Sequence, residues 1–218
     1  MSTKVITVAQ QKGGAGKTTL TAQLAVGFTC ARLRVATIDI DPQGSLTCWS
    51  VLRNEALGSA NDIAHVTTQG WRLRKEIERL KDDNYDVILI DSPPHTQTDA
   101  TIAIRESDLV LVPVQPSALD IWACGETLKC AATEGVPALV VMNRVNARAS
   151  LYEQMRATLH DMNLDIAPVT FGNRVAFATS IAHGLGVAES EPSSNIAVGE
   201  VFDLVRFLKK HKSLKEAG

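Results

Sequence analysis

A glycine-rich segment near the start of the chain has the residue types and the spacing of a phosphate-binding loop. It consists of Lys12, Gly13, Gly14, Ala15, Gly16, Lys17, Thr18 and Thr19. Glycines let the backbone turn so that successive N–H groups point at a β-phosphate, while Lys17 can reach the β- and γ-phosphate oxygens and the Thr18 hydroxyl can ligate Mg²⁺. The segment therefore predicts that the chain binds a nucleoside triphosphate together with Mg²⁺.

Three aspartates that follow apolar runs are candidates to hold the metal ion and a reacting water. Asp91 ends the run at residues 87–90, and a carboxylate beside the phosphate loop can hold Mg²⁺, often through a water. Asp39 and Asp41 close the second apolar run, and period-two alternation turns both carboxylates to one side, where one can orient water and the other Mg²⁺. Two alternatives stay open: Asp91 caps the next turn, or Asp41 is a helix N-cap with Pro42 at the first helical position.

Apolar runs rich in β-branched residues alternate with helical patterns along the chain. The runs expected as strands cover residues 5–9, 34–40, 86–90, 109–114, 138–142 and 165–169. The helical patterns cover residues 17–31, 71–81, 97–106, 119–133 and 151–162. Because these strands are apolar on both faces, both faces must be covered. The pattern predicts an α/β fold, a doubly wound and mostly parallel sheet with helices on both faces, in which ligands bind beyond the carboxyl ends of the strands.

The composition is typical of a globular protein in water. The chain has 218 residues, of which 45% are hydrophobic and 21% charged, and a formal net charge of −2. We expect a single domain over residues 1–218, with a C-terminal helix at about 197–211 and a basic tail to 218. The apolar stretches are too short to span a membrane, and there is no signal-peptide pattern, so we expect a cytoplasmic protein.

The cysteines give no sign of a metal site or of a disulfide framework. Cys30, Cys48, Cys124 and Cys130 include no CxxC spacing. We therefore expect four small, buried thiols.

Three motifs share an order and a spacing with a known family of ATPases. They are the loop from Lys12 to Thr19, the segment Asp39-Ile40-Asp41-Pro42-Gln43 and the segment Ile88-Leu89-Ile90-Asp91. The loop also departs from the ordinary pattern, because position 11 is Gln11 instead of glycine and Lys12 is an additional lysine. The chain resembles the ParA family of partition ATPases through most of residues 4–184. This resemblance implies a P-loop NTPase of the deviant Walker A type that hydrolyses ATP to ADP and phosphate with Mg²⁺.

The resemblance also implies roles for individual residues. In similar proteins a homodimer forms on ATP binding, with Lys12 reaching the phosphates of the other subunit while Lys17 and Thr18 act within their own. Asp41 positions the attacking water and Asp91 supports Mg²⁺. The charge argument agrees, because a lysine aimed across an interface stabilises phosphoryl transfer as an arginine finger does. The alternative for Lys12 is a solvated loop charge.

Residues after two later strands are candidates to contact the nucleotide base or the subunit interface. Asn143 and Arg144 follow a strand end at which relatives contact adenine, although an Asn-Arg pair in a turn is also common. Arg174 lies where similar proteins carry a basic residue near the nucleotide or the interface, with a plain surface arginine as the alternative. Asp120 can pair with Lys12 or cap its own helix.

The end of the chain carries a cluster of basic residues. They are Arg206, Lys209, Lys210, Lys212 and Lys215. Lysines that neutralise phosphates give salt-sensitive binding to DNA of any sequence, whereas the alternative is favourable placement of cations at a helix C-terminus. Longer relatives have a helix-turn-helix domain before the first strand, and only residues 1–3 precede it here, so we expect no sequence-specific reading of DNA.

Together these features predict an ATP-driven positioning switch. An ATP-bound dimer binds nucleoid DNA, and a ParB-like centromere-binding protein or cargo adaptor stimulates hydrolysis, so that a plasmid, a chromosome region or a protein cargo is moved. We expect nucleoid association and no membrane binding. The alternatives are a Min-type ATPase that binds membrane through its C-terminal helix, and a metabolic ATP-dependent enzyme on the same scaffold. A relative of nitrogenase iron protein would need cysteines for a shared cluster, and none closely follows Asp91.

Overall fold

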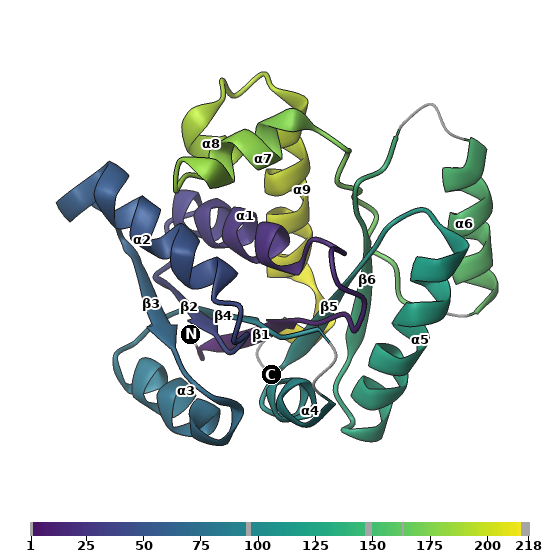
Figure 1. Ribbon diagram of the computed structural model, residues 1–218, viewed down its shortest axis with the longest axis horizontal. Coiled ribbons are helices and arrows are strands. Elements are labelled where there is room, and N and C mark those ends of the chain that lie inside the picture. The colour runs from purple at the N-terminus through teal and green to yellow at the C-terminus, as the bar shows by residue number, and fades with distance from the viewer. Residues whose placement is uncertain (1, 95–96, 147–149, 163, 215–218) are drawn as a thin grey trace.

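One sheet forms the centre of the molecule (Figure 1). The computed structural model describes residues 2–94, 97–146, 150–162 and 164–214. The strands are β1 (Lys4–Val8), β2 (Val35–Asp39), β3 (Ile63–Thr67), β4 (Val87–Asp91), β5 (Leu109–Val114) and β6 (Ala138–Met142). All neighbouring strands pair in parallel, in the order β3-β2-β4-β1-β5-β6. This is the doubly wound α/β fold that the alternating pattern predicts.

The strand order places β4 between β1 and β2, although it follows both in the sequence. In register, Asp91 at the end of β4 pairs with Val8 at the end of β1 and with Asp39 at the end of β2. The ends of these three strands therefore meet at the centre of the carboxyl edge, where ligands bind in this class of sheet.

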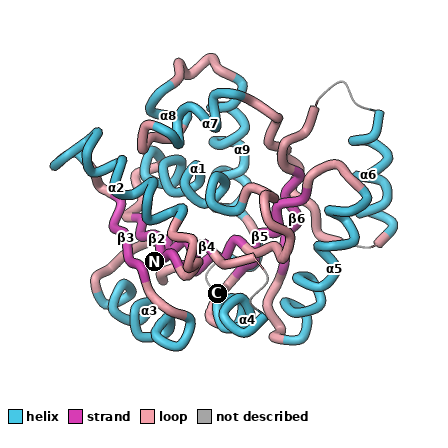
Figure 2. The backbone as a smooth tube through the Cα atoms, viewed as in Figure 1, coloured by secondary structure: helices cyan, strands magenta, loops and turns pink. Residues whose placement is uncertain are grey.

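Helices cover both faces of the sheet (Figure 2). They are α1 (Lys17–Cys30), α2 (Ser45–Leu57), α3 (Leu73–Asp82), α4 (Gln97–Arg105), α5 (Ala118–Thr133), α6 (Ser150–Asp161), α7 (Val175–Ala182), α8 (Val187–Ser190) and α9 (Ile196–Lys210). Three short 3₁₀ segments, η1 (Gly58–Ala60), η2 (Gly70–Arg72) and η3 (Lys212–Leu214), join or follow them.

The two faces have separate apolar cores because side chains alternate along each strand. In β5, Leu109 and Leu111 pack in the cluster with α1, α2 and α7 to α9, whereas Val110 and Val112 pack in the cluster with α4, α5 and α6. A third cluster lies between α3, α4 and the strands β2 and β4. Figure 1 shows the same division, with α1, α7, α8 and α9 on one side of the sheet and α3 and α4 on the other.

The last helix packs closely on α1. A Cβ atom at Gly27 would lie 2.7 Å from Val201 Cγ1 and 2.9 Å from Val205 Cγ2, so the absence of a side chain at Gly27 allows the approach. Val198 and Leu208 are also buried, as their helical spacing predicts. The apolar face of α9 therefore belongs to the core of the fold. Within the described part of the chain, every helix is too short or too polar to span a lipid bilayer.

Several elements differ from the sequence-based expectations. The helices α2, α7 and α8 and the edge strand β3 are not among the predicted elements, and residues 165–169 form only an isolated bridge between Ile166 and Val140 instead of a strand. The C-terminal helix spans Ile196–Lys210, close to the predicted bounds. Residues 215–218 of the predicted basic tail lie outside the described residues.

The cysteines are less uniform than expected. All four are free thiols, but only Cys124 is buried, whereas Cys130 is partly buried and both Cys30 and Cys48 are exposed. The expectation of four buried thiols is therefore wrong for Cys30 and Cys48, whose helices turn them to the surface.

Candidate nucleotide-binding site

The glycine-rich loop joins β1 to α1 at the centre of the carboxyl edge. Gly14 and Gly16 have positive φ angles of 76° and 93°, a backbone conformation that glycine adopts without strain. Gly16 is the N-cap of α1, and no described side chain caps this helix. The free N–H groups of its first turn, together with the helix dipole, are suited to an anion such as a phosphate.

The ends of two neighbouring strands hold the loop in place. The Asn143 side-chain amide, after β6, donates a hydrogen bond of 2.8 Å to the Ala15 carbonyl oxygen, and the Gln115 amide, after β5, donates one of 2.9 Å to the Gly14 carbonyl oxygen. A Cβ atom at Gly16 would lie 2.3 Å from Asn143 Nδ2, so only glycine fits there without displacing Asn143. These contacts orient the loop before any ligand binds.

Lys17 lies at the first position of α1 and is only 7% exposed. No described residue accepts a hydrogen bond from its ammonium group. Burial lowers the pKa of Lys17, and the negative charges of Asp91 and Asp41 oppose this shift. A phosphate bound at the loop would supply the missing partner for a buried cation.

Asp91 and Thr18 meet beside the loop in an arrangement that fits a divalent cation. The Thr18 hydroxyl donates a hydrogen bond of 2.6 Å to Asp91 Oδ2, while the buried Asp91 Oδ1 has no partner among the described residues. Burial raises the pKa of the Asp91 carboxyl to about 7, the Thr18 hydrogen bond opposes this shift, and the nearby Asp39 adds to it. A hydroxyl and an open carboxylate oxygen are ligands that Mg²⁺ accepts together with phosphates and waters.

Asp39 pairs in register with Asp91, but both of its carboxylate oxygens accept hydrogen bonds from residues that follow it closely in the chain. Its Oδ1 accepts a hydrogen bond of 3.0 Å from the Asp41 backbone N–H, and its Oδ2 accepts bonds of 2.9 Å from both the backbone N–H and the hydroxyl of Thr47. The Thr47 hydroxyl also lies 3.1 Å from His65 Nε2 on β3. Asp39 thus anchors the start of α2 to the end of β2.

Asp41 forms a turn instead of a helix cap. Its Oδ1 accepts a hydrogen bond of 2.9 Å from the Gln43 backbone N–H, which is an Asx turn. The N-cap of α2 is Gly44, and the helix begins at Ser45. The alternative in which Asp41 caps a helix that starts at Pro42 is therefore wrong. The Asp41 carboxylate is partly exposed and carries one described hydrogen bond, so it retains acceptors for water.

The extra lysine of the loop is paired inside the subunit. Lys12 Nζ donates a short hydrogen bond to Asp120 Oδ2, and the Asp120 side chain is only 1% exposed. Ser117, and not Asp120, is the N-cap of α5; its hydroxyl accepts from the Asp120 backbone N–H and lies 2.5 Å from Asp120 Oδ2. Of the two expectations for Asp120, the ion pair is therefore the one that the structure contains.

A small pocket of about 130 Å³ lies between the start of α1, the segment after β6 and α7. Asn143, Arg144 and Arg174 line it together with Gly16, Thr19 and Phe177. Arg144 has a positive φ of 52°, and Arg174 is held by Glu200 through hydrogen bonds of 2.5 Å and 3.0 Å. The expected base-contacting residues are thus brought together, and Arg174 joins them.

The basic residues at the end of the chain lie far from the loop. Lys209 lines a pocket with Lys4 and Asp86, which lie at the amino ends of the strands, so the end of α9 is at the opposite edge of the sheet. Lys209 and Lys210 are exposed, and Arg206 pairs with Asp203 at 2.6 Å. Lys212 begins η3, and Lys215 lies outside the described residues.

Three residues of the site are not among those predicted from the sequence. Gln115 and Phe177 act through contacts between elements that are far apart in the chain, whereas Thr47 bonds to Asp39 across the turn between β2 and α2. Gln115 directly follows β5, so the rule that ligand sites gather at strand ends would have found it. No spacing rule predicts the bond between Thr47 and Asp39.

Comparison with known proteins points to one family. The model of the CobQ/CobB/MinD/ParA nucleotide-binding domain matches residues 6–187. The chain is 28% identical over 204 residues to the maintenance of carboxysome distribution protein A of Halothiobacillus neapolitanus, which covers 90% of this chain and 92% of that protein. It is 33% identical over 156 residues to the protein of the same name from Gloeobacter kilaueensis, which covers 71% of this chain and 68% of that one.

Solved structures share the fold. The cell division ATPase MinD of Pyrococcus furiosus superposes with a TM-score of 0.79 at 21% identity, covering 96% of this chain and 99% of that one. An ATP complex of a variant of Cyanothece McdA superposes with a TM-score of 0.76 at 18% identity, covering 94% and 95%. With the phosphate loop at the end of β1 and the family match over most of the sequence, the chain belongs to the CobQ/CobB/MinD/ParA family of nucleotide-binding domains.

Proposed function

We propose that this chain is an Mg²⁺-dependent ATPase that forms a homodimer around ATP and positions a cargo by binding DNA of any sequence. The observation that carries the proposal is the contact between Thr18 and Asp91, 2.6 Å apart, beside an uncapped helix N-terminus and the buried Lys17. This arrangement offers donors to phosphates and an open carboxylate oxygen to a cation within one site.

The proposed roles follow from these surroundings. The backbone of Gly13, Gly14, Ala15 and Gly16 cradles the phosphates, and Lys17 neutralises their charge. Thr18 and Asp91 hold Mg²⁺, which when bound neutralises charge on the β- and γ-phosphates. Thr19, Asn143 and Arg144 border the base and sugar. These assignments of residues to ATP and Mg²⁺ are expectations that ligand-bound structures can test.

Two further residues act on the reacting phosphate in this proposal. Asp41 orients the attacking water, since its carboxylate keeps an acceptor that the loop does not use. Lys12 leaves Asp120 and reaches the ATP of the other subunit, where its charge stabilises the transferring phosphoryl group. Asp39 fixes the conformation of the Asp41 loop, since both of its carboxylate oxygens accept hydrogen bonds from the protein. Its role as an Mg²⁺ ligand stays a prediction.

DNA binding is assigned to the basic end of α9. Arg206, Lys209, Lys210 and Lys212 would contact phosphates, and dimerisation would double the patch and strengthen binding through effective concentration.

A ParB-like or cargo-adaptor protein would stimulate hydrolysis. The cargo is a plasmid, a chromosome region or a protein assembly; the relatives named for carboxysome distribution support the last of these. The protein would then be cytoplasmic and associated with the nucleoid.

The first experiment measures binding to random-sequence duplex DNA with ATP and Mg²⁺, or with ADP and Mg²⁺, at moderate salt. We expect binding with ATP only, and loss of that binding in Lys12→Ala but not in the matched control Lys75→Ala on the exposed side of α3. Anionic phosphatidylglycerol vesicles are tested in parallel. Vesicle binding without DNA binding would replace the proposal with a membrane-associated ATPase, and binding to neither would favour a metabolic enzyme.

Two variants test the chemistry separately. Lys17→Ala should abolish nucleotide binding. Asp41→Ala should still dimerise and bind DNA with ATP but should not turn over. Hydrolysis by Asp41→Ala at the wild-type rate would show that the role given to Asp41 is wrong.

A further inference from the structure

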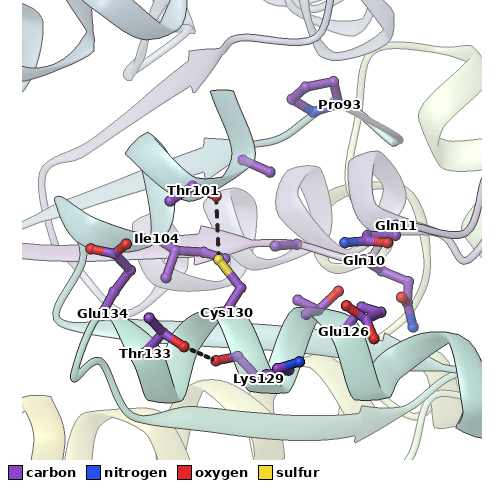
Figure 3. A pocket seen from close by; sticks show the side chains of 13 residues that line it. Gln10, Gln11, Pro93, Thr101, Ile104, Glu126, Lys129, Cys130, Thr133 and Glu134 are labelled. Atoms are coloured by element: carbon purple, nitrogen blue, oxygen red, sulfur yellow. Dashed lines mark hydrogen bonds between the residues drawn. The ribbon is translucent and has the colours of Figure 1, made fainter. Parts of the chain in front are cut away.

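Two loops at the carboxyl edge of the sheet have different surroundings. Beside residues 9–11, which lead into the glycine loop, a cavity of about 290 Å³ lies between α4 and α5, and Figure 3 shows the hydrogen bond from Thr101 to Cys130 that joins these helices. Beside the Asp41 loop, by contrast, side chains of β2, β3 and α2 form a continuous chain of hydrogen bonds. This chain reaches from the edge strand to the residue that is proposed to orient water.

His65 on β3 lies in the middle of this chain. Its Nδ1 is 3.0 Å from the hydroxyl of Thr37, its register partner on β2, and its Nε2 is 3.1 Å from the Thr47 hydroxyl in the first turn of α2. The Thr47 hydroxyl donates to Asp39 Oδ2, and Asp39 Oδ1 accepts the backbone N–H of Asp41. Hydrogen bonds therefore connect the imidazole ring to the backbone of the Asp41 loop.

The partners of His65 determine which of its nitrogens carries the hydrogen. The Thr47 hydroxyl has a single hydrogen, and a carboxylate is a stronger acceptor for it than an imidazole nitrogen. Thr47 Oγ1 is therefore an acceptor toward His65, so Nε2 carries the hydrogen. The Thr67 hydroxyl, 2.9 Å from Thr47 Oγ1, can donate to the second lone pair of that oxygen.

The other nitrogen of the ring is an acceptor. Burial lowers the pKa of His65, and the negative charge of Asp39 opposes this shift, so the ring is held in its neutral form with one N–H. With the hydrogen on Nε2, Nδ1 accepts from the Thr37 hydroxyl. Both ring nitrogens are then paired with protein groups, which fixes the orientation of the ring.

We propose that His65 is a positioning residue for ATP hydrolysis, whose Nε2–H holds the Thr47 hydroxyl on Asp39 and thereby fixes the loop in which Asp41 orients the attacking water. Without this N–H the Thr47 hydroxyl can turn from Asp39 toward the Thr67 oxygen, and the loop loses one of its anchors. The step from the loop to hydrolysis rests on the proposed function, whereas the hydrogen bonds of His65 do not.

The test uses two substitutions that separate the ring nitrogens. In His65→Gln the amide nitrogen takes the place of Nε2 and keeps a donor for Thr47, whereas the shorter amide of His65→Asn takes the place of Nδ1 and leaves Thr47 without that donor. We expect kcat to stay within about twofold of wild type in His65→Gln and to fall about fivefold in His65→Asn, the value of one neutral hydrogen bond. KM for ATP should be unchanged in both variants, because the phosphate loop is not altered. The matched control is His160→Asn, at an exposed position of α6.

Amide hydrogen exchange in the nucleotide-free, full-length protein tests the hydrogen bonds apart from the reaction. The backbone N–H groups of Asp41 and Thr47 both donate to Asp39, so both exchange faster when the loop loses an anchor. We expect exchange at these two positions to be about fivefold faster in His65→Asn and unchanged in His65→Gln. Amides of β1, at the centre of the sheet, serve as the internal reference.

The two measurements separate this inference from the proposed function. A wild-type kcat in His65→Asn, or a loss in His65→Gln as large as in His65→Asn, would overturn the role of His65. Exchange at Thr47 that is the same in His65→Asn and wild type would overturn it as well, even if Asp41→Ala is inactive as the proposed function requires. If Asp41→Ala instead turns over at the wild-type rate, the role given to Asp41 is wrong, and faster exchange in His65→Asn alone would still support the anchoring of the loop by His65.

Discussion

Asp39 and Asp91 occupy equivalent places at the ends of neighbouring strands and have different surroundings. They are paired in register across β2 and β4, and both are fully buried. Asp39 accepts hydrogen bonds from Asp41 in the loop that follows it and from two groups of Thr47 in the first turn of α2. Asp91 accepts a bond from Thr18, across the sheet edge, and its second oxygen has no partner in the described part of the chain.

The difference shows that burial and register alone do not decide what a carboxylate does. A buried carboxylate with both oxygens bonded to the protein fixes the backbone around it. A buried carboxylate with an open oxygen is destabilising until a cation binds. Asp39 therefore belongs to the framework of the site, whereas Asp91 is suited to a ligand.

The largest effect should come from Asp91→Asn measured as Mg²⁺-dependent ATP turnover. The substitution keeps the shape of the side chain and removes the charge that attracts the cation, so we expect turnover to fall by about 100-fold. Steady-state phosphate release at several Mg²⁺ concentrations would measure this. Turnover at the wild-type level would mean that Asp91 does not hold the cation.

Asp39→Ala should be the most destabilising of the changes considered. It leaves the partly buried N–H and hydroxyl of Thr47 and the Asp41 N–H without their acceptor, so we expect the free energy of unfolding to fall by about 3 kcal/mol. Urea unfolding in EDTA measures the loss apart from any ligand. A loss no larger than that of the exposed control Thr158→Val would erase the distinction between the two residues.

The difference in stability between wild type and Asp91→Asn should depend on pH in the metal-free protein. The pKa of Asp91 is raised from 3.8 to about 7, so the folded state binds more protons than the unfolded state between these values. Stability is therefore lost as pH rises through this window, and about 1.4 kcal/mol accompanies each pKa unit. Asp91→Asn should be more stable than wild type at pH 8 and equal to it near pH 4, as urea unfolding in EDTA at both pH values would reveal. Excess Mg²⁺ at pH 8 should shrink the difference.

The smallest effect is expected for Thr47→Val. The backbone N–H of Thr47 still bonds to Asp39, and only the hydroxyl that links Asp39 to His65 is lost, so we expect a destabilisation of about 1 kcal/mol. Thr158→Val, whose hydroxyl is exposed and bonds to the Gln154 carbonyl oxygen within α6, is the control. A loss of stability as large as that of Asp39→Ala would mean that the Thr47 hydroxyl, and not its backbone N–H, provides most of the stabilisation between β2 and α2.

The sequence predicts the central strands and the glycine loop well because their signals are local. Buried parallel strands are continuous apolar runs, and the loop requires particular residues at particular positions. The edge strand β3 escapes this reasoning, since it contains His65 and Thr67 and is only partly buried. The sequence does not predict helix α2 correctly either. Asp41-Pro42 suggests a helix that starts at Pro42, whereas α2 starts at Ser45 with Gly44 as its N-cap.

The contacts of the site were less predictable than its members. Asp39 and Asp91 both follow apolar runs, and their different partners come from Thr18 and Thr47, on separate helices. Residues 165–169 have the apolar pattern of a strand, yet only one bridge to Val140 forms there. Tertiary packing determines the partners of Asp39 and Asp91 and the conformation of residues 165–169. A pattern of residue types along the chain carries no information about that packing.

The insertion of β4 between β1 and β2 also has a consequence for synthesis of the chain. The loop from Lys12 to Thr18 leaves the ribosome many residues before Asp91 does, and β1 and β2 do not pair with each other in the finished sheet. A nascent chain that ends before β4 thus contains the complete loop but lacks the strand that pairs with both β1 and β2. The contact between the loop and Asp91 therefore forms only after β4 has been synthesised and inserted between two strands that precede it.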